Sequence, residues 1–397
     1  AIPENHPQLQ YFRENNYEIL KRAQVLGNIT RQNKGICIAG THGKTTTSTI
    51  TAHLLYQSQV MCSAFLGGIS NNYNTNLLLS KDSNYVVIEA DEYDRSFHQL
   101  SPYMAVITSA DADHLDIYET AEAFRESFEH FTSLIKPGGA LIMRKGVNVN
   151  PVLQKGVKLY TYSMDEGGDF HAENIRFDKG EIRFDFVTPT DRIADVRLGV
   201  PVRINVENSV AAMALAWLNG VTAEELRVGI SSFSGIHRRF NTVFKSEKTV
   251  YMDDYAHHPS ELKASIASIR SLFPDRKITG IFQPHLFSRT RDFASEFAEA
   301  LAALDELLLL DIYPARELPI PGVTSEIILK EVKLADKNIY SKEDVISELK
   351  KRDLDVVVTF GAGDIDRLVP ILRDELRKQH QAASKEEKEE HLETIAE

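Results

Sequence analysis

One short turn of this chain combines residue types that bind phosphate: Gly40-Thr41-His42-Gly43-Lys44-Thr45-Thr46. It follows an apolar run, Gly35 to Ala39, and opens a segment with apolar residues at helical spacing, Thr46 to Gln57. Backbone N–H groups in such a turn can cradle phosphate oxygens, and the helix N-terminus adds a favourable dipole. Lys44 supplies a charge for the β- and γ-phosphates, and the Thr45 hydroxyl is placed to ligate Mg²⁺. The usual motif would need glycine where this chain has Ile38, so an ordinary glycine turn is the alternative.

Two further candidate metal ligands follow predicted strands. Glu89 ends the apolar run Tyr85 to Ile88, and His114 comes after the run Met104 to Thr108. The carboxyl ends of strands in an open parallel sheet face the ligand crevice, so we expect both side chains near the phosphate turn. A carboxylate and an imidazole suit Mg²⁺ that is held partly by protein and partly by nucleotide phosphates. The alternatives are a solvated loop carboxylate for Glu89 and a histidine without a ligand for His114.

A second group of basic and titratable side chains lies in the C-terminal half of the chain. It follows two predicted strands, Thr249 to Met252 and Ile278 to Phe282. Imidazole and guanidinium groups gathered at strand ends suit recognition of a carboxylate. The members of this group are His257, His258, His285, Arg289 and Arg291.

Strands and helices alternate along most of the chain, which predicts parallel sheets covered on both faces. Between Val157 and Val206 the pattern changes to alternating apolar residues, and Asp178-Lys179-Gly180 separates two such runs. That is a hairpin signal, so we expect a small antiparallel addition to the first α/β unit. A second α/β unit is expected to begin at about 239–245, with later strands at Leu307 to Ile312 and Val356 to Phe360.

The composition excludes several classes of protein. The chain has 397 residues, of which 43% are hydrophobic and 26% charged, as in an ordinary globular protein of two or three domains. No apolar run approaches the roughly 18 residues of a membrane helix, and no signal peptide is visible, so we expect a cytoplasmic protein. The net charge of −12 argues against nucleic acid or anionic membranes as partners. The two cysteines, Cys37 and Cys62, lack metal-ligand spacing and are expected to be buried thiols.

Taken together, these residues resemble the Mur ligase family. The resemblance covers nearly the whole chain, because the phosphate turn is followed in order by several other stretches: Glu89 to Asp94, Asp113-His114-Leu115-Asp116, Asp253 to Pro259, Phe282-Gln283-Pro284-His285, Asp311-Ile312-Tyr313 and Gly361-Ala362-Gly363-Asp364. It implies an α/β fold in which a central P-loop ATPase domain precedes a Rossmann-like C-terminal α/β domain. The central domain would have a mostly parallel sheet with the small antiparallel addition.

The resemblance also implies domain limits. The family's N-terminal UDP-binding domain would be represented only by a remnant at residues 1–27, which suggests a fragment. A central ATP-binding domain would follow at 28–238, and a C-terminal domain at 239–378. Residues 379–397 are strongly charged and would form a disordered acidic tail.

Individual roles follow from the resemblance in the same way. ATP would contact the turn Gly40, Thr41, His42, Gly43, Lys44, Thr45 and Thr46 together with Asn208, Arg239 and Asp254. Mg²⁺ would be held by Thr45, Glu89 and His114, and the catalytic residues would be Lys44, Glu89, His114 and His257. The substrates would contact His257, His258, His285, Arg289 and Arg291. Asn208 could instead cap a helix, Arg239 could instead form a salt bridge, and Asp253 competes with Asp254 for the nucleotide.

Two departures from the family pattern affect these assignments. Where some members have an arginine after the histidine at 285, this chain has Leu286, so carboxylate recognition would depend on Arg289 and its neighbours. Sister ligases use a modified lysine downstream of the metal histidine. No lysine occurs between His114 and Lys136, so we expect none here.

The activity that the resemblance implies is ATP-dependent amide formation in peptidoglycan precursor synthesis. The lactyl carboxylate of UDP-N-acetylmuramate would become an acyl phosphate, and L-alanine would displace the phosphate, in a monomer or weak homodimer. One alternative is a ligase of the same family that attaches a recycled tripeptide to the same sugar nucleotide. The others are a P-loop kinase or simple ATPase and, for a fragment, a non-catalytic ATP-binding module.

Overall fold

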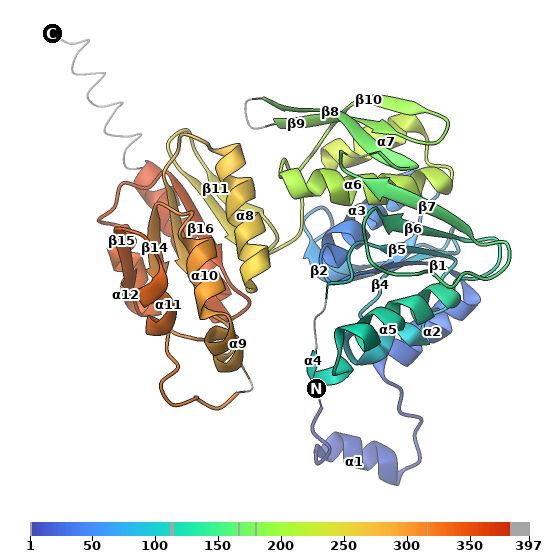
Figure 1. Ribbon diagram of the computed structural model, residues 1–397, viewed down its shortest axis with the longest axis horizontal. Helices are drawn as coiled ribbons and strands as arrows, with labels where there is room; N and C mark the ends of the chain where they lie inside the picture. The colour runs from blue at the N-terminus through green and yellow to red at the C-terminus, as the bar shows by residue number, and fades with distance from the viewer. Residues whose placement is uncertain (1, 112–114, 166, 179–180, 316, 382–397) are drawn as a thin grey trace. The chain divides into compact units, whose positions relative to one another are not determined.

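The computed structural model describes residues 2–111, 115–165, 167–178, 181–315 and 317–381, and these cluster into two compact units (Figure 1). Unit 1 contains the described residues up to 176 together with 183–199 and 205–233. Unit 2 contains the other described residues, chiefly those from Ser234 onward. Each unit has its own sheet and its own core, as the alternation of strands and helices predicts.

Unit 1 is built on a ten-stranded sheet with the order β10-β9-β8-β7-β6-β5-β1-β4-β2-β3. The central strand β1 pairs in parallel with β4 and with β5, so that Ile38 lies beside both Glu89 and Val106. The ends of these three strands therefore meet at one edge of the sheet. The strands are β1 (Lys34–Ala39), β2 (Ser63–Ser70), β3 (Thr75–Leu78), β4 (Tyr85–Glu89), β5 (Met104–Ile107), β6 (Ala140–Arg144), β7 (Lys158–Ser163), β8 (Phe170–Asp178), β9 (Glu181–Val187) and β10 (Arg192–Arg197).

Helices cover both faces of this sheet (Figure 1). Alternate residues of β1 explain why: Cys37 and Ala39 belong to a core shared with α2 and α5, while Ile36 and Ile38 are buried on the opposite face. The phenylalanines at 124, 128 and 131, four and three residues apart, form the buried stripe of α5. The helices of unit 1 are α1 (Pro7–Glu14), α2 (Arg22–Gln32), α3 (Lys44–Tyr56), η1 (Tyr93–Gln99), α4 (Leu115–Tyr118), α5 (Ala121–Ser133), α6 (Arg203–Leu218) and α7 (Ala223–Ser232).

The expected antiparallel addition is present, because β9 pairs antiparallel with β10. β8 and β9, which flank the predicted turn, are neighbours in the sheet, and these strands extend the central sheet of unit 1. Lys179 and Gly180 of that turn lie outside the described residues. β7, in contrast, pairs in parallel with both β6 and β8. Parallel pairing is possible because long connections, not tight turns, join β6 to β7.

Unit 2 is a six-stranded sheet with the order β11-β12-β16-β13-β14-β15. One core packs the sheet against α8, α10 and α11, and a second packs its other face against α12 and the helix at 368–381. This is the doubly wound arrangement that the sequence predicts. The elements are β11 (Asn241–Lys245), β12 (Val250–Asp254), α8 (Pro259–Leu272), β13 (Ile278–Phe282), α9 (Phe287–Asp292), α10 (Ala294–Leu301), β14 (Glu306–Leu309), α11 (Glu326–Glu331), β15 (Asp336–Ile339), α12 (Lys342–Leu349), β16 (Val356–Phe360) and η2 (Asp364–Arg367).

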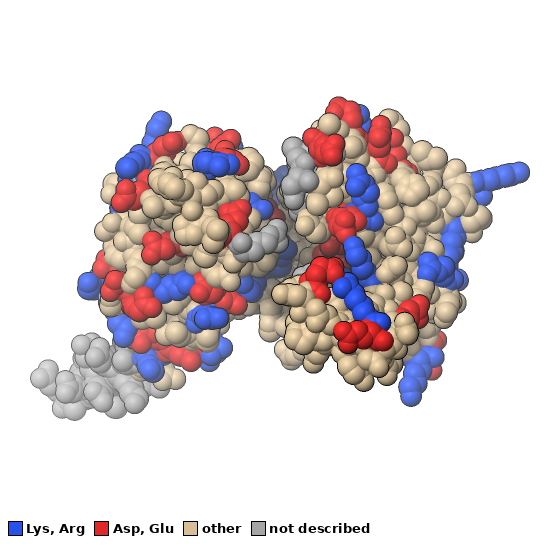
Figure 2. Space-filling view, turned by 90° about the horizontal axis from the view of Figure 1, so that it is seen from below, with Lys and Arg blue, Asp and Glu red and all other residues tan. Residues whose placement is uncertain are grey.

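The surface and the cysteines agree with a globular protein. Acidic and basic side chains are interspersed over the visible face of each unit (Figure 2). Cys37 and Cys62 are buried and unbridged, which confirms the prediction of buried thiols. Within the described ranges, no helix combines the length and apolarity that crossing a membrane requires.

Candidate functional site

The phosphate turn joins β1 to α3 and is held by the segment that follows β5. Gly40 has a φ of 137°, and a Cβ atom there would lie 2.0 Å from Thr108 Oγ1, so no larger residue fits. The His42 N–H donates to Ser109 Oγ at 2.9 Å. Helix α3 begins at Lys44, directly after Gly43 in the left-handed conformation. Its first N–H groups, which have no partner within the helix, therefore lie at the turn, as an anion site requires.

Lys44 is held inside the turn by a buried acid. Its Nζ donates to Glu92 Oε1 at 2.7 Å and to the Gly40 carbonyl oxygen at 2.6 Å. Glu92 is only 1% exposed, and burial raises the pKa of its carboxyl although the Lys44 ammonium opposes that shift. The Tyr118 hydroxyl donates to the Glu92 carbonyl oxygen. This arrangement keeps an ammonium group at the place where the phosphates of a nucleotide would lie.

The residues around Thr45 fit a hard cation. The Thr45 hydroxyl donates to Glu89 Oε1 at 3.1 Å, and Glu89 Oε2 is buried with no hydrogen-bond partner among the described residues. A hydroxyl and a carboxylate with an unsatisfied oxygen form the oxygen-rich donor set that Mg²⁺ prefers. In the part of the chain that the structure describes, no three His, Cys, Asp or Glu side chains gather to hold a metal. His114 lies outside the described residues, so its role as a ligand stays a prediction.

Asn208 reaches the phosphate turn from a distant helix. Its Oδ1 accepts from the Thr47 hydroxyl at 3.3 Å across 161 residues of sequence, and a Cβ atom on Gly43 would lie 2.9 Å from the same oxygen. Asn208 lies inside α6, which begins at Arg203, so the alternative of an N-cap is wrong. The structure therefore brings Asn208 next to the turn, beside Asn205, which accepts from its amide at 3.2 Å.

The second cluster lies where β12, β13 and β14 end in unit 2. The rings of His257 and His285 are 5.8 Å apart, and His285 stacks on Tyr313 at 5.7 Å. Burial lowers the pKa of His257, and the nearby Arg289 lowers it further. His257 Nδ1 lies 3.0 Å from the Tyr255 carbonyl oxygen, an acceptor, so Nδ1 carries the proton and Nε2 is the basic nitrogen.

Other predicted residues serve different contacts in this structure. His258 Nδ1 caps α8 through Ser260, and the Arg291 guanidinium is exposed and pairs with Asp292 at 2.7 Å. Asp254 is buried and accepts from Ser265 Oγ at 2.5 Å, and burial raises its pKa. The structure thus brings His257, His285 and Arg289 together, while the side chains of His258, Arg291 and Asp254 are engaged elsewhere.

The stretch Gly235 to Phe240, which precedes β11, contains two arginines with different contacts. Arg239 lies over the Tyr255 ring at 5.2 Å, and its predicted contact with phosphate stays a prediction. Arg238 was not singled out from the sequence. It donates to the Gly361 carbonyl oxygen at 2.5 Å and lies 3.6 Å from Asp253, whose pKa burial raises to about 6. Arg238 therefore fixes the glycine-rich turn after β16.

The sequence did not indicate a role for two acidic residues, Glu92 and Glu317. Glu92 was part of a quoted stretch without a role, and Glu317 lay outside every quoted motif. The sequence gave only a weak signal for Glu92, namely its place in an acidic loop three residues after Glu89. Glu317 gave no local signal, because its partner Ser288 lies 29 residues away in the sequence.

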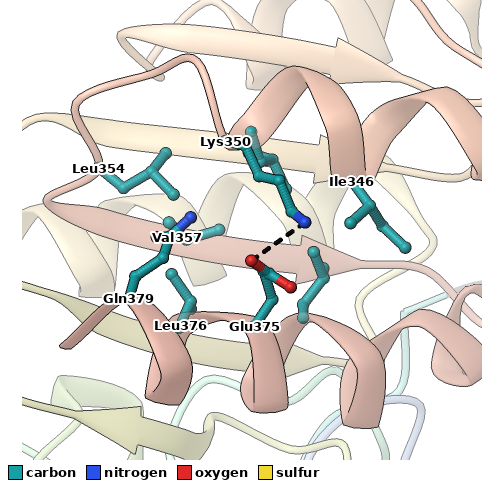
Figure 3. Close-up of a pocket in the computed structure, with 9 residues that line it drawn as sticks. Ile346, Lys350, Leu354, Val357, Glu375, Leu376 and Gln379 are labelled. Carbon is teal, nitrogen blue, oxygen red and sulfur yellow. Dashed lines mark ion pairs between the residues drawn. The ribbon is translucent and has the colours of Figure 1, made fainter. Parts of the chain in front are cut away.

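A small apolar cleft on unit 2 does not contribute to either cluster (Figure 3). Leu354, Val357 and Leu376 line it, and Lys350 pairs with Glu375 at 3.1 Å across its rim. It lies between α12 and the helix at 368–381 and contains no nucleophile or imidazole. We interpret it as a packing gap.

Comparison with known proteins identifies relatives over both units. The Mur ligase middle domain matches residues 38–216, and the Mur ligase glutamate ligase domain matches residues 238–363. A UDP-N-acetylmuramate–L-alanine ligase of Phocaeicola vulgatus is 61% identical over 371 residues, which are 93% of this chain and 81% of that protein. The protein of the same name from Cytophaga hutchinsonii is 47% identical over 372 residues, 93% of this chain and 80% of the relative.

Solved structures agree with these relatives. The UDP-N-acetylmuramate–alanine ligase MurC of Thermotoga maritima superposes with a TM-score of 0.78 at 25% identity, over 96% of this chain and 84% of that one. The MurF ligase of the same organism, solved with ADP, gives a TM-score of 0.67 at 18% identity over 91% of this chain and 86% of its own. The second likeness supports the fold alone.

Proposed function

The chain belongs to the Mur ligase family, and from this premise we propose that it joins L-alanine to the lactyl carboxylate of UDP-N-acetylmuramate using ATP. The relatives named for this reaction share up to 61% identity and match 93% of the chain. The observation that carries the proposal is local: Lys44, Thr45 and Glu89 meet where β1 and β4 end, with Asn208 behind the turn. That set is suited to a nucleoside triphosphate.

The residues of unit 1 would prepare the first step. The Lys44 ammonium would exchange Glu92 for the β- and γ-phosphates, while the first N–H groups of α3 bind phosphate oxygens. Mg²⁺, held by Thr45, Glu89 and His114, would supply charge neutralisation for phosphoryl transfer. Attack of the sugar carboxylate on the γ-phosphorus then gives an acyl phosphate and ADP.

The residues of unit 2 would serve the amino acid. The alanine carboxylate stays ionised throughout the reaction, whereas the lactyl carboxylate becomes an acyl phosphate. A permanently charged guanidinium, Arg289, therefore suits the alanine carboxylate. His257 is kept neutral by burial, so its Nε2 can accept the proton that the alanine ammonium loses before attack on the acyl carbon. Phosphate then leaves.

Phosphate release tests this proposal when ATP, Mg²⁺, UDP-N-acetylmuramate and L-alanine are omitted in turn, with the natural full-length protein. We expect release only with all four. The Lys44→Met variant should lose about 10²–10³-fold in turnover, the usual loss when one preorganised charge contact is removed. Lys34→Met is the matched control, because Lys34 lies at the opposite end of β1, over the Tyr85 ring at 5.0 Å. It should stay within about threefold of wild type.

Three results would contradict the proposal. Phosphate release that continues without the sugar nucleotide or without L-alanine would show that the protein is only an ATPase. A preference for a tripeptide over L-alanine in direct competition would favour the recycling ligase. Near-normal turnover of Lys44→Met would remove the phosphate turn from the mechanism. Because Lys44→Met leaves Glu92 buried without its partner, the double variant with Glu92→Gln serves as the folding control.

A further inference from the structure

We infer that Glu317 is a positioning residue: its carboxylate fixes the short helix α9 so that Arg289 is presented to the carboxylate of the amino-acid substrate. This inference rests on the proposed function, because it assumes an amino acid whose carboxylate contacts Arg289. Glu317 itself would touch no reacting atom. Its effect would pass through the helix that carries the arginine.

The Glu317 carboxylate holds the first turn of α9 at two points. One oxygen, Oε2, accepts from the Ser288 N–H at 3.0 Å, and the other, Oε1, accepts from the Ser288 hydroxyl. Burial alone would raise the pKa of Glu317, but these hydrogen bonds and the Arg289 charge outweigh it and lower that pKa. The contact is therefore made by an ionised carboxylate and is stronger than a bond between neutral groups.

Backbone hydrogen bonds fix the segment after β14 that carries the carboxylate. The Glu317 N–H donates to the Pro314 carbonyl oxygen at 2.9 Å. Just before it, Tyr313 exchanges backbone hydrogen bonds with the segment after β13: its N–H donates to Pro284 and its oxygen accepts from Leu286. Backbone hydrogen bonds thus connect the segment after β14 to the segment after β13, as far as the residue that precedes α9.

Helix α9 needs such an anchor. It has six residues, and no side chain at its N-cap forms a hydrogen bond. The N-cap residue, Leu286, has φ 72° and ψ 136°, which is unfavourable for a branched side chain. A helix this short is not stable by itself, so tertiary contacts must hold it. The Glu317 carboxylate is the charged contact at its start.

Arg289 is where the positioning would take effect. Its Nη1 is buried and has no hydrogen-bond partner among the described residues. The same guanidinium lies close enough to His257 to lower the pKa of that imidazole. The imidazole of His257 follows the end of β12. A buried, unpaired guanidinium nitrogen beside it is suited to bind a ligand anion. Its position depends on α9, because Arg289 is the third residue of that helix.

The test compares Glu317→Gln with a matched carboxylate in unit 1. Glu225 also accepts from a backbone N–H and a hydroxyl at the start of a helix, at 2.8 Å each from Thr222. Steady-state kinetics of the full-length protein would give kcat and the KM values for L-alanine and ATP. For Glu317→Gln we expect the KM for L-alanine to rise about tenfold, with kcat and the KM for ATP within about twofold. Glu225→Gln should change none of the three by more than about twofold, although it should lower Tm.

A double variant separates positioning from general weakening. If the Ser288 hydroxyl acts through Glu317, Ser288→Ala combined with Glu317→Gln should raise the KM for L-alanine no more than Glu317→Gln alone. If Glu317→Gln does not fold, Ser288→Ala alone becomes the decisive variant, with an expected rise of about threefold.

Several outcomes would overturn the inference. An unchanged KM for L-alanine in Glu317→Gln, or in Ser288→Ala where that variant decides, would remove the positioning role. A fall in kcat together with equal rises in the KM values for L-alanine and ATP would show that Glu317 is merely structural. A wild-type protein that releases phosphate without regard to L-alanine would instead overturn the proposed function, whatever the variants do.

Discussion

Glu92 is the buried partner of Lys44 at the phosphate turn. In this structure it neutralises Lys44 at 2.7 Å in a place almost closed to solvent. An unpaired buried ammonium would be costly, so the carboxylate keeps the lysine charged inside the turn. When ATP binds, its phosphate oxygens would replace the Glu92 carboxylate as the anionic partner of Lys44. The sequence indicated Lys44 from a local motif but could not indicate this partner, because the pairing depends on how β1 and β4 lie side by side.

His53 is a second buried ionisable residue, and it leads to a prediction about stability. It lies in α3, with Nδ1 2.8 Å from the Tyr73 hydroxyl and Nε2 3.0 Å from Ser232 Oγ. Burial lowers its pKa from 6.5 to about 4. Between those values the unfolded chain binds a proton that the folded chain does not. Folding stability should therefore fall as pH falls through this window.

The expected size follows from the width of the window. Between pH 6.5 and pH 5 this one group should remove about 2 kcal/mol from the free energy of unfolding. Urea denaturation at both pH values would measure it, with His53→Gln as the comparison because glutamine cannot titrate. Wild type should lose about 2 kcal/mol more than His53→Gln over that interval. Equal losses would mean that His53 is already protonated in the folded state at pH 5.

At the scale of elements, the regular strands were predictable and the irregular segments were not. The strands β1, β4, β5, β13 and β16 are continuous apolar runs, and the structure confirms them within one or two residues. The short helix α9, by contrast, was not expected from the sequence, and Phe293 separates it from α10. Tertiary contacts such as that of Glu317 with Ser288 hold it, and no local pattern contains them.

The start of α6 shows a local signal that was available but unused. The helix begins at Arg203, five residues before Asn208, which the sequence offered as a possible cap. Pro201 lies two residues before the observed start, and proline is common near helix N-termini. The earlier start matters for the site, because it makes Asn208 a residue of the helix interior that faces the phosphate turn.

The phosphate turn gives a prediction that separates two costs of replacing glycine. Gly40 and Gly138 both have positive φ, at 137° and 83°, but only Gly40 would place a Cβ atom against another residue. Gly138→Ala should lose about 1 kcal/mol of stability from backbone strain, with normal ATP binding. Gly40→Ala should lose more stability and weaken ATP binding at least tenfold, since Thr108 and Ser109 must move. Calorimetric ATP titration would measure it, and equal affinities of the two variants would contradict the close approach.

At the scale of the whole molecule, the proposed reaction uses residues from both units. The residues proposed for the nucleotide, Lys44, Thr45 and Glu89, belong to unit 1. Those proposed for the amino acid, His257 and Arg289, belong to unit 2. The sequence indicated both sets, because each follows strands of its own sheet. It could not indicate which member of each set would be engaged in other contacts, as Asp254 and His258 are.

Each unit should fold without the other if its core is self-contained. Among the described residues, two cores of unit 2 use no residue before Phe240, and the core that packs the unit 1 sheet against α2 and α5 uses none after Val157. Chains of residues 1–233 and 234–397 should therefore each melt cooperatively, and 1–233 should retain ATP binding.

A mixture of these two chains at about 1 μM should ligate alanine about a thousandfold more slowly than the intact chain, because a covalent connection provides an effective concentration in the millimolar range. Circular dichroism melting and phosphate release would measure both expectations. Unfolded halves would show that the cores depend on each other, and a fully active mixture would show that the units bind tightly without a connection.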